Sequence, residues 1–154
     1  MNSVQSARRR GVTLIETIMV IALLAAAATT SLLLMDGQWI AKREVTAVSN
    51  DTANALITAR NTAITSQAIV RVRRERNSGG TQLTIIQDPG PFRSGHQWTM
   101  DLGSDAQVSG SPTEIQFTPM GTANRSLKWK IAQSRTSGEV TVSPASGQVL
   151  RRLP

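Results

Sequence analysis

Residues 8–16 read RRRGVTLIE, and residues 17–35 continue as TIMVIALLAAAATTSLLLM without a charged side chain. As a helix, these 19 uncharged residues would extend roughly 28 Å, at about 1.5 Å per residue. The hydrocarbon core of a bilayer is ~30 Å thick. A chain that crosses lipid once must form a helix, because only a helix satisfies the backbone hydrogen bonds within the crossing segment. The run from Thr17 to Met35 therefore predicts a membrane-spanning helix.

The charged residues near this run predict its orientation and single out one acid. Arginines fill residues 8–10 and no comparable cluster follows the run, so the positive-inside bias keeps residues 1–10 in the cytoplasm. Glu16 is costly at the start of a membrane helix, and an ionisable group there is a functional candidate. The local sequence offers it a partner only if the chain is cut after Gly11, which would leave a positive α-amino group on Val12.

The segment GVTLIE, from Gly11 to Glu16, follows a basic leader and precedes an apolar helix. It resembles the class III signal of type IV pilins and type II secretion pseudopilins. The resemblance implies cleavage after Gly11 by the prepilin peptidase, methylation of the new amine on Val12, and pairing of Glu16 with the amine of a neighbouring subunit. The family most often has Phe where this chain has Val12, and this departure concerns methylation more than cleavage.

Two other kinds of N-terminal segment share some of these features. A secretory signal peptide also has a basic start, an apolar run and a small-residue cleavage site, which Ala25–Ala28 would supply. An uncleaved single-pass anchor is the other alternative. Neither has a use for a carboxylate at the position of Glu16, so Glu16 favours the pilin-type signal. A mature chain starting at Thr29 or Met1 would favour one of the alternatives.

Length and composition allow one small domain on one anchor. The chain has 154 residues, or 143 after the predicted cut, and no cysteine, which excludes disulfides and thiolate metal sites. The formal charge of +7 falls to +4 when the leader is removed with its three arginines. This mildly basic balance is compatible with nucleic acid or another anionic partner and specifies neither.

The region after the apolar run predicts a second, amphipathic half of the same helix. Asp36-Gly37 marks the expected membrane exit, and Trp39 suits the membrane interface. Residues 40–68 contain no Pro or Gly, and a stripe of small or apolar residues recurs every three or four positions. The stripe is Ala41, Val45, Val48, Thr52, Ala55, Ala59 and Ala63, with Leu56 and Ile64 beside it, and the opposite face carries Lys42, Asn50, Asn54, Arg60 and Asn61. One helix of about 55 residues, on the order of 80 Å long, is expected to pack this stripe on the protein's own sheet.

From Ile69 the apolar period changes to two, which predicts strands. Residues 69–73 and 82–86 flank the turn signal at 77–80 and predict a hairpin, whereas DPGP at 88–91 predicts a loop. Further strands are expected at residues 97–100, 107–108, 114–118, 126–131, 139–142 and 148–151. Alternation is clearest where Leu127, Trp129 and Ile131 alternate with lysines, as in an antiparallel sheet with one wet face.

Three segments of the C-terminal half resemble the GspH/FimT domain of minor pseudopilins and minor pilins, over about Ala41 to Arg152. They are Ile115-x-Phe117-x-Pro119-x-Gly121, Val140-x-Val142 and Gly147-x-Val149. The resemblance implies an α+β, pilin-like fold, with a long N-terminal helix packed against a small antiparallel sheet or a two-sheet head. The expected parts are a cleaved leader (1–11), a transmembrane and assembly half of the helix (12–36), and an exported head (37–154). The head includes the rest of the helix, to about residue 68, and a β region (69–152).

The chain lacks the converging groups that an enzyme or a metal site needs. His96 is the single histidine and is interpreted as a solvated side chain. Asp101 and Asp105 form only a loose acidic pair. The sequence contains no glycine-rich phosphate loop after a strand and no nucleophile elbow. We therefore predict a protein that is not an enzyme and that uses no metal and no cofactor.

Basic residues gather at two places in the β region. Arg71, Arg73, Arg74 and Arg76 lie on the first strand and its turn, and Arg151 and Arg152 lie near the end of the chain. One interpretation is a charged edge strand and a solvated tail, which keep sheets from pairing with other chains. The other interpretation is that five of these six arginines, all except Arg76, contact phosphate groups. It follows from the family resemblance, because some FimT-type minor pilins bind DNA through a basic tail. Those tails have an Arg directly after the Gly, whereas here Gln148 follows Gly147, and this departure weighs against DNA binding.

Both resemblances predict a structural subunit, a minor pseudopilin or minor pilin of a type II secretion pseudopilus or a type IV pilus. The expected partners are the prepilin peptidase, other pilin or pseudopilin subunits, the inner-membrane assembly platform and the membrane. Nucleic acid is an alternative partner, for a role in DNA uptake. The expected location is the inner membrane, crossed once with the N-terminus in the cytoplasm and the head in the periplasm, and then the filament.

Overall fold

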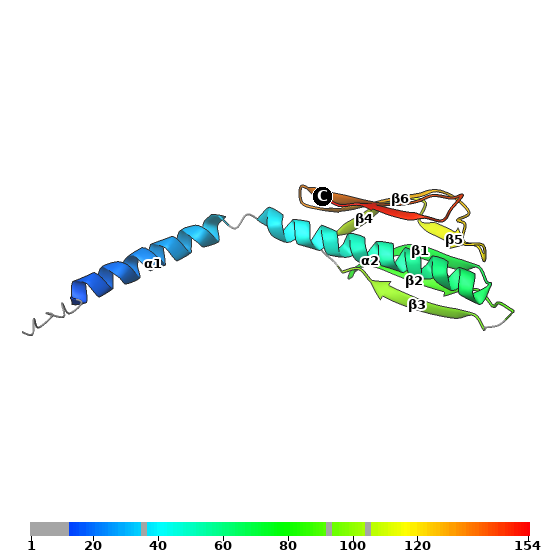
Figure 1. The fold of residues 1–154 in the computed structure, drawn as a ribbon, viewed down its shortest axis with the longest axis horizontal. Coiled ribbons are helices and arrows are strands. Elements are labelled where there is room, and N and C mark those ends of the chain that lie inside the picture. Colours follow the sequence, from blue (N-terminus) through cyan, green and yellow to red (C-terminus); the bar gives the residue numbers. More distant parts are fainter. Residues whose placement is uncertain (1–12, 35–36, 92–93, 104–105) are drawn as a thin grey trace, which may run out of the picture. The chain divides into compact units, whose positions relative to one another are not determined.

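The computed structural model describes residues 13–34, 37–91, 94–103 and 106–154 (Figure 1). The chain forms two compact units, Met1–Asp36 and Gly37–Pro154. The predicted membrane run falls in the first unit and the predicted head in the second. Their predicted continuity as one helix depends on residues 35 and 36, which lie outside the described residues.

The described part of the first unit is the helix α1 (Leu14–Leu34). Every side chain from Leu14 to Thr30 is exposed, including the large apolar residues near the start of the helix. The hydroxyl groups of Thr29 and Thr30 donate hydrogen bonds to carbonyl oxygens one turn earlier, at 2.9 to 3.1 Å. Among the described residues, the structure contains no helix with the length and apolarity that a membrane crossing requires.

The second unit begins with α2 (Gly37–Ser66), which has no proline and no glycine after its first residue. The predicted stripe of small and apolar residues is buried, and Val45, Leu56 and Ala59 have no exposed surface. The helix ends two residues earlier than expected because Gln67 adopts a left-handed φ of 51°. The N–H of Ala68 then donates to the carbonyl oxygen of residue 63 at 3.3 Å, the geometry of a Schellman cap.

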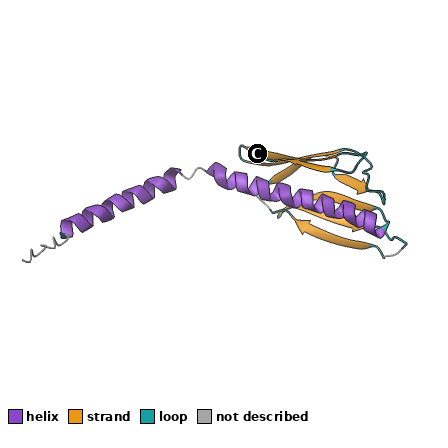
Figure 2. Ribbon diagram, in the orientation of Figure 1, coloured by secondary structure: helices purple, strands orange, loops and turns teal. Residues whose placement is uncertain are grey.

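The described residues after α2 form two antiparallel sheets (Figure 2). Sheet A has the order β3-β2-β1-β5, and sheet B has the order β4-β6-β7-β8. The strands are β1 (Val70–Asn77), β2 (Gly80–Gln87), β3 (His96–Asp101), β4 (Gln107–Ser111), β5 (Glu114–Phe117), β6 (Leu127–Gln133), β7 (Thr136–Val142) and β8 (Val149–Arg152). Of the two predicted possibilities, one sheet or a two-sheet head, the structure has two sheets.

The β1–β2 hairpin is longer than the sequence predicts. The strands pair from Val70 opposite Gln87 to Asn77 opposite Gly80, so the arginines at 74 and 76 lie in a strand and not in a turn. Gly80 has a φ of 135°, which an L side chain rarely adopts, and this glycine lets the chain reverse tightly. The cross-strand backbone hydrogen bonds continue to the turn even where apolar alternation has stopped.

The core lies where α2 covers both sheets (Figures 1 and 2). Trp129, Phe117 and Leu56 are its largest fully buried side chains. In β6 Leu127, Trp129 and Ile131 are buried and the two lysines between them are exposed, which confirms the predicted alternation. The buried core residues, from Ala41 to Val142, all belong to the second unit, so the head has a hydrophobic core of its own.

Candidate functional site

The start of α1 carries Glu16, the predicted assembly residue. Thr13 precedes the helix, and its hydroxyl oxygen accepts a hydrogen bond from the Glu16 backbone N–H at 3.4 Å. The Thr13 carbonyl oxygen also accepts the N–H groups of Glu16 and Thr17, at 3.0 and 3.2 Å. Thr13-x-x-Glu16 has the spacing of a capping box, and an acid in the first turn also favours the positive end of the helix dipole. Glu16 is therefore placed for a capping role at the helix start, which this spacing in the sequence was sufficient to predict.

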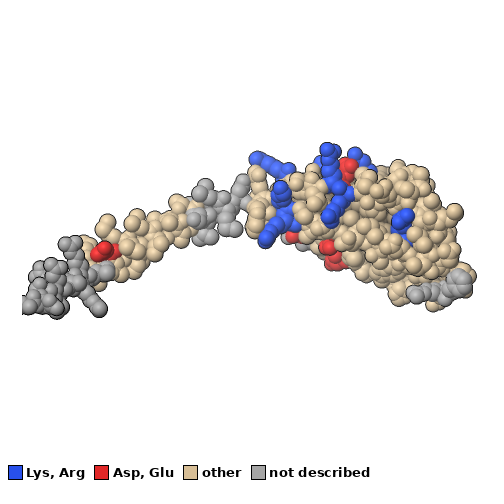
Figure 3. Space-filling view, in the orientation of Figure 1, with Lys and Arg blue, Asp and Glu red and all other residues tan. Residues whose placement is uncertain are grey.

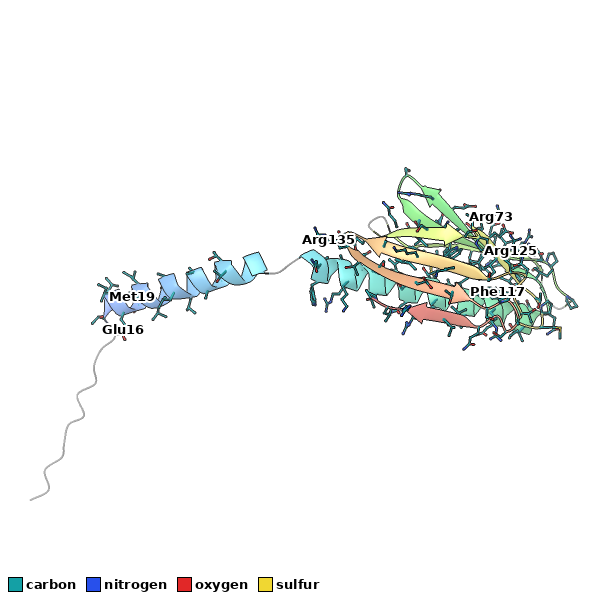
Figure 4. All side chains as sticks on the ribbon, turned by 90° about the horizontal axis from the view of Figure 1, so that it is seen from above. Glu16, Met19, Arg73, Phe117, Arg125 and Arg135 are labelled. Atoms are coloured by element: carbon teal, nitrogen blue, oxygen red, sulfur yellow. The ribbon has the colours of Figure 1, made fainter. Side chains whose placement is uncertain are left out.

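Glu16 is also the only charged residue of α1 (Figure 4). It is exposed among exposed apolar side chains, such as Ile15 and Met19, which are 70% and 62% exposed. Within the described part of the chain, no side chain forms an ion pair with it. Gly11 and Val12, the predicted cleavage and methylation positions, lie outside the described residues. The described helix thus carries one exposed carboxylate among exposed apolar side chains.

In the head, the segments that end in Gly121 and begin with Gly147, two of the three that resemble the GspH/FimT domain, meet at a side chain of α2 and are called the two motif segments below. The Nε of Arg60 donates a hydrogen bond to the carbonyl oxygen of Gly121 at 2.9 Å. Gly147 lies against the same carbonyl group, because a Cβ atom at Gly147 would stand 1.9 Å from the Gly121 oxygen. Both glycines have left-handed φ angles, 77° and 61°. The segments ending in Gly121 and starting with Gly147 are therefore joined through Arg60.

The role of Arg60 was not predicted from the sequence. The helical pattern places it on the polar face of α2, whereas in the structure it is half-buried and bonded to the chain beyond β5. With Ile57 and residues 146–149, it lines a shallow groove between α2 and the start of β8. Its partner is a backbone carbonyl 61 positions away, so no local pattern marks the contact.

Two of the candidate DNA-contact arginines are engaged in ion pairs on sheet A. Arg71 pairs with Asp88. The Nε of Arg73 donates to Oε2 of Glu114 at 2.8 Å. This hydrogen bond, with the charge of Glu114, raises the pKa of Arg73, and the same bond lowers the pKa of Glu114. Both guanidinium groups thus have carboxylate partners within the head.

A third candidate, Arg74, lies between the two sheets. Its Nη2 donates to the carbonyl oxygen of Gly110 in β4 at 2.9 Å, and its Cζ is 5.4 Å from the ring centroid of Trp129 in β6. Burial lowers the pKa of Arg74. Trp129 is itself held by a hydrogen bond from Nε1 to the Pro112 carbonyl oxygen at 2.6 Å. Arg74 therefore links β1 of sheet A to sheet B.

The last two candidates, Arg151 and Arg152, are consecutive in the edge strand β8. Arg151 stands opposite the buried Val140 and donates a hydrogen bond to Oδ1 of Asn50 on α2. Arg152 stands opposite Glu139, and consecutive residues of a strand point to opposite faces. The two arginines therefore face opposite sides of sheet B, and the five candidates are divided between two sheets.

His96 is exposed at the start of β3, and its ring stacks on Trp98 with the ring centroids 5.7 Å apart. Asp101 accepts the N–H of Gly103 through Oδ1 at 2.9 Å, and Asp105 lies outside the described residues. Over the described ranges, no group of three His, Asp or Glu side chains is arranged to hold a metal ion. Asp101 therefore holds the start of the loop that follows β3.

Comparison with known proteins gives one family and one fold. Residues 48–152 match the family described as "Type II transport protein GspH". Among solved structures, the chain is similar to the type IV minor pilin FimU of Pseudomonas aeruginosa (strain PAO1). The P21 crystal form matches with a TM-score of 0.58 and 15% identity, over 73% of this chain and 90% of that chain. The P65 crystal form matches with a TM-score of 0.55 and 15% identity, over 68% of this chain and 90% of that chain. No curated protein sequence matches the chain.

The family match covers most of the head, including α2 from Val48 and every strand. The structural match confirms the predicted α+β, pilin-like fold, a helix on antiparallel sheets. Pilin and pseudopilin families consist of structural subunits and not of enzymes. The chain therefore belongs to the GspH family of type II transport proteins and has the fold of a type IV minor pilin.

Proposed function

We propose that this protein is a minor pseudopilin or minor pilin, assembled into a type II secretion pseudopilus or a type IV pilus. The observation that carries the proposal is Glu16, an exposed carboxylate and the only charge on an apolar helix, in a chain whose head matches the GspH family. The FimU-like fold supports the same class of protein. The subunit is held in the inner membrane by the apolar run from Thr17 to Met35, whose last residue lies outside the described part of the chain, with its head in the periplasm, and it later enters the filament.

Processing by the prepilin peptidase comes first in this proposal. The peptidase cuts after Gly11 and removes the three arginines of the leader. Val12 becomes the N-terminal residue and its amine is methylated. This cut places a positive amine four residues before Glu16, so the mature N-terminus carries both an anion and a cation.

Assembly then brings α1 from lipid into a bundle of like helices. A charged side chain at the centre of a membrane helix costs about 2.5–3.5 kcal/mol, and less near an end. Glu16 therefore gains from a cationic partner, which the Val12 amine of a neighbouring subunit supplies. The exposed apolar side chains of α1, such as Ile18 and Leu23, pack against neighbouring helices at the inner-membrane assembly platform.

Substitution of Glu16 separates its charge from its capping role. Gln serves as well as Glu in a capping box, so Glu16→Gln keeps the helix start and removes the charge. We expect Glu16→Gln and Glu16→Ala to be cleaved normally and to be lost from the assembled complex, measured by cross-linking and co-purification with the other subunits. Normal incorporation of Glu16→Gln would contradict the counter-ion role and leave capping as the function of Glu16.

A second substitution tests processing independently of assembly. Gly11→Leu places a bulky side chain at the cleavage position, and we expect the uncut precursor to accumulate in the membrane fraction. The precursor is distinguished from the mature chain by its mass and by its reaction with an antibody against the leader. Full processing of Gly11→Leu would place the cut elsewhere in the chain.

DNA binding for uptake is the alternative function, and it is favoured by the exposure of Arg151 and Arg152 at the end of β8. The three candidate arginines of β1, at positions 71, 73 and 74, have partners inside the head, so they contribute less to this alternative. Phosphate contacts would make affinity fall steeply with salt, and Arg151→Ala/Arg152→Ala would weaken binding to every sequence. A fragment from Ile40 to Pro154 that shows no salt-sensitive binding to DNA would remove this alternative.

A further inference from the structure

One surface of the head combines an exposed aromatic ring with basic side chains that the proposed function does not use. Trp39 is 53% exposed, and the Cζ of Arg43 lies 4.0 Å from the centroid of its ring. Lys42 and Asn50 line the same face of α2. Arg151 of β8 reaches this face through its hydrogen bond to Oδ1 of Asn50. These five residues are called the proximal patch below.

Charge is segregated around this part of α2. Glu44 lies on another flank of α2, near Gly103 in the loop after β3. A Cβ atom at Gly103 would stand 3.9 Å from Oε1 of Glu44. Asp51 shares that flank because seven residues complete about two helical turns. Figure 3 shows Lys and Arg side chains gathering on the part of the head where α2 begins, and Figure 4 places Arg135 of the β6–β7 turn at the same end. The proximal patch thus presents positive charge away from the acidic flank.

The proximal patch also lies at the start of the head in sequence. Only residues 35 and 36 separate the end of α1 from the start of α2. With α1 held in a bilayer, the covalent connection keeps Trp39 and Arg43 close to the lipid surface. Tryptophan favours the boundary between lipid and water, and Lys and Arg near a membrane are attracted to anionic headgroups.

We propose that the proximal patch binds the headgroup phosphates of anionic phospholipids at the surface of the membrane that holds α1. Trp39 enters the interface, and Lys42, Arg43 and Arg151 contact phosphate oxygens. The head is then docked on the membrane until the subunit joins a filament. The inference rests on the proposed function for the anchoring of α1, whereas lipid binding by the head is a property that can be measured separately.

The test uses residues 37–154, because the head has a core of its own. The fragment is titrated with vesicles of phosphatidylcholine, alone or mixed with phosphatidylglycerol, and binding is measured by flotation and by the change in tryptophan emission, to which the exposed Trp39 contributes. We expect binding to the mixed vesicles that weakens as salt screens the charges, and little binding to phosphatidylcholine alone. Each Lys or Arg near an anionic surface contributes about fivefold to affinity, so Arg43→Gln/Arg151→Gln should bind roughly 25-fold more weakly.

The matched control is Arg125→Gln/Lys130→Gln, which removes the same charge from two exposed side chains. Figure 4 places Arg125 away from the end of the head where Arg135 lies. The control should bind the mixed vesicles as the unmodified head does. Equal losses in both double variants, or equal binding to both kinds of vesicle, would overturn the proposal.

A short DNA duplex is the competing ligand. If the head binds the duplex more tightly than the mixed vesicles, and Arg43→Gln/Arg151→Gln loses that binding, the surface is assigned to nucleic acid and the lipid proposal is wrong. A head that binds neither ligand also overturns the lipid proposal. Neither result changes what the Glu16 variants report, so the two proposals fail separately.

Discussion

Replacing Gly147 with alanine would disrupt the contact that joins the two motif segments of the head. The new Cβ would stand 1.9 Å from the carbonyl oxygen of Gly121 and 3.0 Å from Nε of Arg60, so the backbone has to move. The left-handed φ of 61° costs an L residue about 1–2 kcal/mol. Forcing extra atoms into a packed region typically costs about 1–3 kcal/mol more. We expect Gly147→Ala to lower the free energy of unfolding by about 2–5 kcal/mol.

Urea unfolding of residues 37–154, followed by tryptophan fluorescence, to which the buried Trp129 contributes, measures this loss. The control is Gly79→Ala in the β1–β2 turn, where a Cβ would have no neighbouring atom within 4 Å. The control should change the free energy of unfolding by no more than about 0.5 kcal/mol. Equal transition midpoints for Gly147→Ala and Gly79→Ala would refute the close contact between the two motif segments.

Two further predictions concern the arginines of β1. Arg74→Leu removes a hydrogen bond and a cation–π contact between the sheets, so it should lower the free energy of unfolding by about 1–3 kcal/mol. The control is Arg76→Leu at an exposed position, which should change the free energy of unfolding by less than about 0.5 kcal/mol. Equal urea midpoints for the two variants would count against the link. Because Arg73 holds the pKa of Glu114 below its ordinary value, their pair stabilises the head above the ordinary glutamate pKa, and this stability is lost as the pH falls through the folded pKa. The pair is partly solvated, so the effect is small; Glu114→Gln should flatten the acid side of a stability–pH curve, and an unchanged slope would contradict this.

Much of the head follows from local periodicity. The buried stripe of α2 and the alternation around Trp129 were predictable because each element buries one face, and the spacing of apolar residues records that face. The turn signal before Gly80 likewise located the first hairpin. These features depend on residues that are near each other in the chain.

The features that the sequence did not predict depend on contacts between distant segments. Arg60 looks like an ordinary polar helix residue until Gly121 and Gly147 are brought beside it. Arg74 looks like part of a charged turn until β1 is extended by pairing with β2 and is set against Trp129. In both cases the partner belongs to a segment distant in the chain, and the contact leaves no local signal.

Glu16 shows that one residue can satisfy two physical requirements. Its position three residues after Thr13 suits a helix cap, and its position in an apolar helix creates a need for a counter-ion. The two requirements act at different times in the proposed function, since the position for a cap exists in the single subunit and the counter-ion comes from a neighbour. This is why Glu16→Gln is more informative than Glu16→Ala.

The intact mass and N-terminal sequence of the protein, extracted from membranes of cells that contain its prepilin peptidase, test the proposed processing and assembly most directly. A chain that starts at Val12, lacks residues 1–11 and carries one added methyl group is expected. A mature chain that starts at Met1 would show that no amine is created for Glu16, and one that starts at Thr29 would show that Glu16 itself is removed; either result would contradict the proposed role of Glu16.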